Sequence, residues 1–400
     1  MKMNSILSAG LGETTRAFTV KLPPHVEFGL RKADQLADFM HTLFPKLKPR
    51  ILLICSPRTA HETALSSLTN TLKEKGYFCS LWAEAVTEPT VENIDQAAAL
   101  LSEFAPDVFV AVGGGSVIDT AKALALLATN RGSIRDFLFG GDRKIEIPPL
   151  PIIALPTTAG SGSEITGSCV ISDTKRGVKL SVTDNRLIPR IAVVDPLLHV
   201  GMPAFVTAST GMDALTHAIE AYVSKNANPI SDAFAEKAIE LIGTYLRVAV
   251  VDGGNIEARS GMAQAAVLGA MAFLNAGLGA VHGISQSVSG VIHSAHGVTN
   301  AVLLPIVMRF NIPGNPMKFA RIASILGEQA DDTQTLSALA VTAVDDLSKE
   351  IGIPRRLSDL GLQCTQFKQI VESTMQYRML SYNPVPVTRQ NVQTLLQAAF

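Results

Sequence analysis

The residues best suited to chemistry are an aspartate and several histidines in the second half of the sequence. Asp213 and His217 lie four residues apart in the segment GMDALTH, so in a helix they project from one face. His282 and His296 follow within 260–308, which contains no Asp, Glu, Lys or Arg. A carboxylate with several buried imidazoles is a ligand set for a divalent metal ion. An aspartate hydrogen-bonded to a core histidine would give the same local pattern, so the metal prediction depends on the downstream histidines.

The spacing of the downstream histidines requires a break in the chain. In one unbroken helix, residues 282 and 296 would lie roughly 21 Å apart at 1.5 Å per residue, which is too far to share an ion. We therefore expect a break at Ser289-Gly290. His293 is an alternative metal ligand, which could take the place of His296.

A glycine-rich turn is the second candidate site. Gly113, Gly114, Gly115 and Ser116 follow an apolar run and precede a helical pattern. Glycines let the backbone approach a pyrophosphate, and a helix N-terminus adds favourable partial charge. A plain strand-to-helix turn needs at most one glycine, so three in succession favour phosphate binding. The arrangement is not the G-x-G-x-x-G pattern of dinucleotide-binding turns.

A second polar loop, LPTTAGSGSE, leaves the next apolar run and contains Thr157 and Thr158. Because parallel strands end at one edge of a sheet, we expect this loop beside the glycine turn. Taken alone, its small residues are equally compatible with a simple turn.

Strands and helices must position these residues, and their patterns divide the chain in two. Short apolar runs predict parallel strands that are covered on both faces, at 50–55, 107–112, 151–155 and 191–194. Helical patterns lie between them at 60–75, 91–104 and 117–128. This order predicts a Rossmann-like α/β domain with a mostly parallel sheet at 1–198. Only helical patterns follow, at 211–224, 231–251, 256–273, 336–351 and 392–399. They predict an all-helical domain at 199–400, and because the candidate metal ligands lie in it, we expect this domain to bind the metal and the substrate.

One apolar segment, 261–281, is long enough to cross a bilayer. It is rich in Ala and Gly and contains Gln264 and Asn275, so we favour a buried helix of a large core.

Composition narrows the class of partner. The formal net charge of −1 is too small to attract nucleic acid or an anionic membrane over long range. The four cysteines lie far apart without a CxxC pair, which indicates a reducing compartment. The first residues lack the pattern of a signal peptide, so we expect a cytoplasmic protein that binds a small molecule. Charged residues make up only 17% of the chain, which suggests apolar surface buried between subunits.

Together these segments resemble the iron-containing (group III) alcohol dehydrogenase family over nearly the whole chain. The resemblance is carried, in order, by GGGSVIDTAK, LPTTAGSGSE, GMDALTHAIEAYVS, GLGAVHG and HSAHGVTNAVLLP. It implies an active site in a cleft between the domains, with Asp213, His217, His282 and His296 as metal ligands. It also implies a pyrophosphate loop at 113–116 with Asp119 behind it, and Thr157 and Thr158 near the nicotinamide. More weakly, Lys179 aligns near the cofactor and Phe273 near the active site. Family members commonly form homodimers or larger assemblies.

Two departures from the family pattern affect the expected chemistry. Many members have a second cleft histidine where this chain has Gln286, so the alcohol proton must leave through a ribose hydroxyl and water, or through His293. NAD-preferring members commonly have an aspartate where this chain reads Ser56-Pro-Arg58. An arginine there could bind a 2′-phosphate, so NADP is at least as plausible as NAD.

The expected activity is hydride transfer between NAD(P) and a small alcohol or its carbonyl compound, assisted by a Lewis-acid metal ion. The resemblance implies Fe²⁺, although the ligand set also suits Zn²⁺ and other divalent ions.

Three alternatives stay open. A reductase of oxoacids, like maleylacetate reductase, would need a cationic group for the substrate carboxylate. A lyase like dehydroquinate synthase would need additional Lys and Arg in the cleft, and 260–308 offers none. A helical scaffold joined to a degenerate nucleotide domain would leave four ligands without a use.

Overall fold

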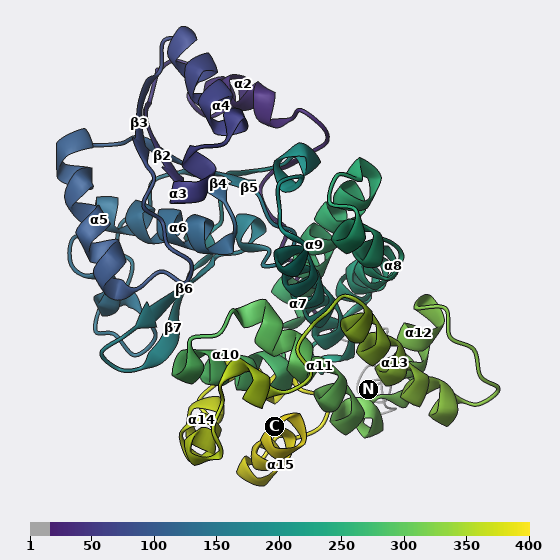
Figure 1. The fold of residues 1–400 in the computed structure, drawn as a ribbon. Helices are drawn as coiled ribbons and strands as arrows, with labels where there is room; N and C mark the ends of the chain where they lie inside the picture. The colour runs from purple at the N-terminus through teal and green to yellow at the C-terminus, as the bar shows by residue number, and fades with distance from the viewer. Residues whose placement is uncertain (1–16) are drawn as a thin grey trace, which may run out of the picture.

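The computed structural model describes residues 17–400, and the residues on which the expected lack of a signal peptide mainly rests lie outside this range. The four predicted strands form, as β2 (Arg50–Cys55), β4 (Val108–Gly113), β5 (Ile152–Pro156) and β8 (Ile191–Val194). They belong to a six-stranded sheet of order β1-β8-β5-β4-β2-β3, and every pair in it is parallel (Figure 1). The predicted fold class is confirmed.

The two edge strands, β1 (Val26–Phe28) and β3 (Phe78–Trp82), were not predicted. β1 is only three residues long, and most residues of β3 are half-buried or exposed, so neither has the continuous apolar run typical of a central strand.

Helices cover both faces of the sheet. α2 (Leu36–Leu43) and α4 (Thr63–Glu74) pack on one face, while α5 (Val91–Phe104) and α6 (Gly115–Thr129) pack on the other. Alternate residues of each strand serve the two faces: Ile51 and Leu53 face the first pair of helices, and Leu52 and Ile54 face the second. The predicted helix at 60–75 forms as α4, which begins only at Thr63 because the short helix α3 (Pro57–Ala60) precedes it.

An antiparallel hairpin, β6 (Ser168–Asp173) and β7 (Val178–Thr183), was also missed. It is inserted between β5 and β8 and forms a separate two-stranded sheet. In Figure 1 it lies below the main sheet, on the side of the helical region.

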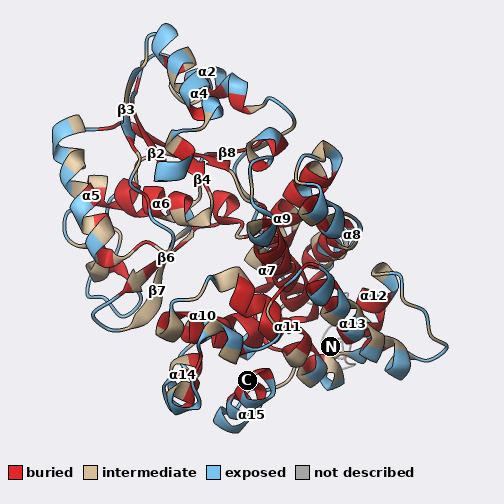
Figure 2. Ribbon diagram, in the orientation of Figure 1, coloured by how far each residue is buried: buried red, intermediate tan, exposed pale blue. Residues whose placement is uncertain are grey.

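The rest of the chain is helical, as predicted. The expected boundary at 198/199 falls in the 3-10 turn Pro196–His199, between β8 and α7 (Ala204–Val223). α7 is buried along nearly its whole length and packs against α8 (Pro229–Val251) and α9 (Ile256–Ala276) (Figure 2). The remaining helices are α10 (Ala280–Ile292), α11 (His296–Asn311), α12 (Pro316–Ile325), α13 (Thr333–Glu350), α14 (Phe367–Thr374) and α15 (Arg389–Ala399).

The chain does break between His282 and His296, but not at Ser289-Gly290, so that placement was wrong. Both residues stay inside α10. The helix ends at Ile292 because His293 takes a left-handed backbone conformation, with φ of 52°. A new helix, α11, then begins at His296.

No single helix within residues 17–400 is long and apolar enough to cross a membrane. α9 and α10 reach the required length and apolar character only when they are taken together, and the pair is bent by 105° at the break between them.

Candidate active site

Three helices bring the predicted metal ligands together. Asp213 and His217 lie on α7, His282 lies in the first turn of α10, and His296 opens α11. The close approach of α11 to α7 depends on Gly297, where a Cβ atom would lie 2.5 Å from the carbonyl oxygen of Ser209. Any side chain at position 297 would therefore push His296 away from Asp213.

The ligand atoms converge as a metal site requires. One atom each of Asp213, His217 and His282 lies within 4.8 Å of the others. Oδ1 of Asp213 is 3.9 Å from Nε2 of His217 and 3.8 Å from Nε2 of His282. His296 is not part of this group of three, but its ring is centred 5.3 Å from that of His282, and all four residues line the cleft. Three imidazoles and one carboxylate suit a divalent first-row ion, so the donor set fits the implied metal.

Asn300 is a further polar residue in the cluster. Its Nδ2 lies 2.7 Å from Oδ1 of Asp213, 3.2 Å from Nε2 of His282 and 3.1 Å from Nε2 of His296. Its Oδ1 is buried and has no hydrogen-bond partner among the described residues. The lone pairs of three candidate ligands thus converge on one point, as they must to bind a cation.

The protonation of the cluster also favours cation binding. Burial lowers the pKa of His217 to about 4, although the charge of Asp213 opposes the shift. Burial likewise lowers the pKa of His296 to about 3. Burial alone would raise the pKa of Asp213, but the surrounding imidazoles hold it below its usual range. At neutral pH His217 and His296 therefore present neutral imidazole lone pairs, and Asp213 presents an ionised carboxylate.

Glu220 positions His282 and was missed by the sequence analysis. Its Oε2 lies 2.6 Å from Nδ1 of His282, and its Oε1 accepts a hydrogen bond from the backbone N–H of Val281. A carboxylate on the far nitrogen fixes the orientation and tautomer of a ligating imidazole. Asp213, His217 and Glu220 stand at i, i+4 and i+7 of α7, a helical periodicity that could have revealed this third residue.

We expect Glu220→Gln to weaken metal binding about 10- to 100-fold, because a neutral amide supports the imidazole less well than a carboxylate. Competition with a chromogenic chelator measures the affinity. The control is Glu236→Gln, because Glu236 lies on α8, outside this cluster. Unchanged metal affinity in Glu220→Gln would contradict the positioning role.

The glycine turn lies across the cleft from the ligand cluster. Gly113 ends β4, Gly114 caps α6, and Gly115 is the first residue of α6. A Cβ at Gly113 would lie 2.5 Å from Val117, and one at Gly115 would lie 2.5 Å from Oγ of Ser161. Neither of these two positions can therefore hold a side chain without displacing its neighbours. The turn presents the N-terminus of a 15-residue helix to the cleft.

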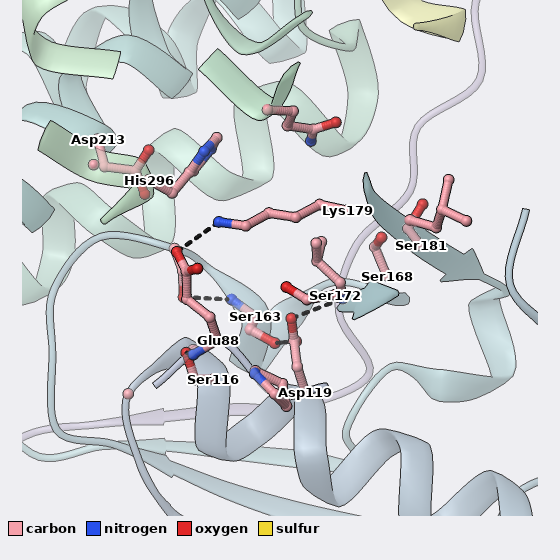
Figure 3. A pocket seen from close by; sticks show the side chains of 18 of the residues that line it. Glu88, Ser116, Asp119, Ser163, Ser168, Ser172, Lys179, Ser181, Asp213 and His296 are labelled. Carbon is pink, nitrogen blue, oxygen red and sulfur yellow. Dashed lines mark hydrogen bonds and ion pairs between the residues drawn. The ribbon is translucent and has the colours of Figure 1, made fainter. Parts of the chain in front are cut away.

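The other predicted cofactor residues also line this cleft, which has a volume of about 1570 Å³. Thr157 and Thr158 follow β5, and Asp119 lies on α6 behind the glycine turn. Nζ of Lys179, on β7, lies 2.5 Å from Oε1 of Glu88 (Figure 3). Glu88 has a left-handed backbone with φ of 59°, and its N–H donates to Oγ of Ser116. This acidic residue beside the glycine turn was not predicted.

The far end of the cleft lies where β2 ends, at Ser56 and Arg58. Ser56 caps α3 by accepting a hydrogen bond from the N–H of Thr59. The Arg58 guanidinium donates to the carbonyl of Gly201 at 2.6 Å. Glu62, which the sequence analysis did not single out, lines the cleft beside them.

Three residues that we expected near the substrate, Phe273, Gln286 and His293, fall in different places. Phe273 lines the cleft, and its ring is centred 4.5 Å from that of His217. Gln286 also lines the cleft, one helical turn beyond His282. His293 is exposed and lies outside the cleft lining, so the structure does not bring it to the site.

The segment 260–308 supplies no cation to the cleft, as its sequence requires. Other segments do supply cationic side chains that line the cleft: Arg58, Arg143, Lys144, Arg176, Lys179, Arg186 and Arg378. Several of them are paired with acids, as Lys179 is with Glu88 and Arg186 with Asp184.

Comparison with known families matches both halves of the chain. Residues 23–196 match the iron-containing alcohol dehydrogenase family, and residues 207–400 match the C-terminal region of the Fe-containing alcohol dehydrogenase family.

Known relatives and solved structures agree with this match. The 1,3-propanediol dehydrogenase of Klebsiella pneumoniae is 40% identical over 86% of this chain and 89% of its own length. The NAD-dependent methanol dehydrogenase of Bacillus methanolicus is 39% identical over 87% of this chain and 91% of its own length. The crystal structure of a 1,3-propanediol oxidoreductase superposes with a TM-score of 0.91 at 37% identity, covering 96% of this chain and all of that one. The chain therefore belongs to the iron-containing alcohol dehydrogenase family and is an oxidoreductase of that type.

Proposed function

We propose that the protein oxidises primary alcohols to aldehydes, and reduces aldehydes in the reverse direction, with NAD as hydride carrier and Fe²⁺ held by Asp213, His217, His282 and His296. One observation carries the proposal: the four ligand side chains and the glycine turn face each other across a single cleft. A scaffold protein would need neither feature.

The bound ion would supply Lewis acidity, favouring the ionised form of the alcohol and polarising the aldehyde carbonyl. The N-terminus of α6 would bind the pyrophosphate of the coenzyme, while Thr157 and Thr158 would position the nicotinamide half. Oxidation converts RCH₂OH and NAD⁺ into RCHO, NADH and a proton. Gln286 cannot titrate and His293 lies outside the cleft, so the proton would leave through a ribose hydroxyl and water.

The decisive experiment combines metal analysis with absorbance of the reduced nicotinamide for a panel of alcohols and aldehydes. Bound metal and chelator-sensitive NADH formation are expected. Full activity in a metal-free preparation would contradict the proposal.

For the coenzyme, we propose NAD rather than NADP. The relative from Bacillus methanolicus is NAD-dependent by name. In this chain Glu62 lines the cleft together with Ser56 and Arg58. There its carboxylate would accept a hydrogen bond from a ribose 2′-hydroxyl and repel a 2′-phosphate.

Replacing Glu62 by glutamine should raise kcat/KM for NADP about tenfold, because the repulsion of the phosphate is removed. Steady-state kinetics with both coenzymes measures the ratio. Arg58→Ala is the matched variant and should change kcat/KM for NADP less than about threefold, since its guanidinium is engaged by Gly201. A large loss of NADP activity in Arg58→Ala would instead identify Arg58 as a phosphate ligand.

An oxoacid reductase is the second candidate, because Arg378 lines the cleft with its guanidinium 5.8 Å from the ring centre of Phe139. Including oxoacids in the substrate panel, with wild type and Arg378→Gln, tests this candidate. Oxoacid turnover that depends on Arg378 would support it.

A cytoplasmic location and a homodimer or larger homo-oligomer stay predictions from composition and resemblance. Size-exclusion chromatography with light scattering measures the assembly.

A further inference from the structure

A lysine is fully buried beneath the proposed coenzyme site. Lys122 lies on α6 and has no exposed surface. Its Nζ donates to Oγ of Ser163 at 2.7 Å and to the carbonyl of Ser168 at 2.8 Å, and it lies 3.7 Å from Oδ1 of Asp119. A buried ammonium is costly unless it has a partner of opposite charge, and Asp119 is the carboxylate that pairs with Lys122.

Asp119 connects this buried lysine to the cleft. Its Oδ1 accepts a hydrogen bond from Oγ of Ser163 at 2.5 Å, and its Oδ2 accepts one from the N–H of Val170 at 2.9 Å. The side chain is 14% exposed and lines the cleft, whereas Lys122 does not line it. Figure 3 shows Asp119 on α6 and linked to Ser163, close to Ser116 of the glycine turn. Each carboxylate oxygen keeps acceptor capacity for a ligand in the cleft.

The charges around Asp119 give Lys122 an electrostatic role. Burial raises the pKa of Asp119, and Lys122 is the strongest influence that lowers it. The other ionisable groups facing this pair are Glu164 and Cys169. Burial raises the pKa of Glu164 to about 7 and that of Cys169 to about 12. Burial lowers the pKa of Lys122, and the charge of Asp119 is the strongest influence that raises it. Neither Glu164 nor Cys169 can supply positive charge, so Lys122 and Asp119 are the pair whose opposite charges stabilise each other.

We propose that Lys122 is a positioning residue that holds Asp119 ionised and fixed, so that the Asp119 carboxylate accepts hydrogen bonds from a ribose diol of the coenzyme. The proposal rests on the coenzyme site of the proposed function. A ribose diol offers two hydroxyl donors, and an ionised carboxylate accepts such bonds roughly twice as strongly as a neutral group does. The same contacts join α6 to Ser163 and to β6, so Lys122 also ties together three segments of the coenzyme-binding wall.

The test follows NADH binding from pH 5.5 to 9 by nicotinamide fluorescence, for wild type, Lys122→Met and Lys122→Gln. Without the ammonium, the pKa of Asp119 rises further, so the carboxyl takes up a proton more readily as the pH is lowered. We expect the wild-type dissociation constant to change less than about threefold over this range, whereas that of Lys122→Met rises about tenfold between pH 9 and pH 6. Lys122→Gln keeps hydrogen-bond donors for Ser163 and Ser168 but removes the charge. It should show the same pH dependence as Lys122→Met, and it replaces that variant in the test if Lys122→Met fails to fold.

Two further variants isolate the cause. Asp119→Asn should bind NADH more weakly at every pH, and adding Lys122→Met to it should create no pH dependence. Glu164→Gln combined with Lys122→Met should keep the pH dependence, because Glu164 is not its source.

A purely structural role for Lys122 would weaken NADH binding equally at every pH, and that result would overturn the inference while leaving the proposed function intact. Wild-type protein that binds no NADH at any pH would contradict the proposed function, and this inference with it.

Discussion

Replacing His282 by alanine is expected to remove the bound divalent ion and to lower kcat/KM for alcohol oxidation at least about a thousandfold. The expected loss is large because a Lewis-acid ion contributes several kcal/mol of transition-state stabilisation, and each 1.36 kcal/mol corresponds to a factor of ten. His282 is central to the ligand cluster, since Asp213, His217 and His296 surround it and Glu220 fixes its far nitrogen. Metal content by mass spectrometry and NADH formation measure the two effects separately.

The chain offers a matched control for this substitution at the other end of the same helix. His293 is exposed and lies outside the cleft, so His293→Asn should leave metal content and activity unchanged. Asparagine suits this position because it tolerates the left-handed backbone that His293 adopts. A His282→Ala protein that retains a stoichiometric ion and full activity would rule out the proposed metal site.

The central fold was predictable because its signals are local. Each central strand is buried on both faces, so the apolar runs of β2, β4, β5 and β8 stand out in the sequence. The hairpin of β6 and β7 lacks such a run, since alternate residues are only half-buried along β6 and most of β7 is half-buried or exposed. Its serines and Lys179 line the cleft, and their polarity concealed the strands.

The break between α10 and α11 shows a limit of local reasoning. Geometry required a break before His296, but glycine was the wrong residue on which to place it. Gly290 is buried within α10, whereas His293 ends the helix in a conformation that glycine usually supplies. The position at which α10 ends therefore depends on how α10 and α11 pack, and not on the helix propensity of a single residue.

The candidate site was predictable where residue type alone implies chemistry, as for Asp213 and the three histidines. Asn300, Lys122 and Glu62 were missed because amides, lysines and acids are mostly surface residues. Glu220 was missed although its spacing from Asp213 and His217 places it on the same face of α7. Their roles depend on contacts with distant parts of the chain, such as Lys122 with Ser168.

The glycine turn gives the second large effect, through Gly115. Replacing Gly115 by alanine should raise the KM for NAD about a hundredfold, because the new Cβ would lie 2.5 Å from Oγ and 2.8 Å from Cβ of Ser161. To relieve that overlap, the loop after β5 or the first turn of α6 must shift, and both segments line the cleft where the coenzyme is proposed to bind. The effect should fall on coenzyme binding more than on metal content, so NADH titration and metal analysis distinguish it from His282→Ala.

A compensating change separates steric overlap from other causes. In the double variant Gly115→Ala, Ser161→Gly, the side chain that meets the new methyl group is gone, so the KM for NAD should return to within about tenfold of the wild-type value. Ser161→Gly alone serves as the control for the loss of the hydroxyl, whose Oγ accepts a hydrogen bond from the N–H of Ser163. If the double variant binds coenzyme no better than Gly115→Ala, the new methyl group obstructs the coenzyme itself rather than overlapping Ser161, because Gly115 has helical backbone that alanine also adopts. If Gly115→Ala binds NAD as the wild type does, the α6 N-terminus is not the pyrophosphate site.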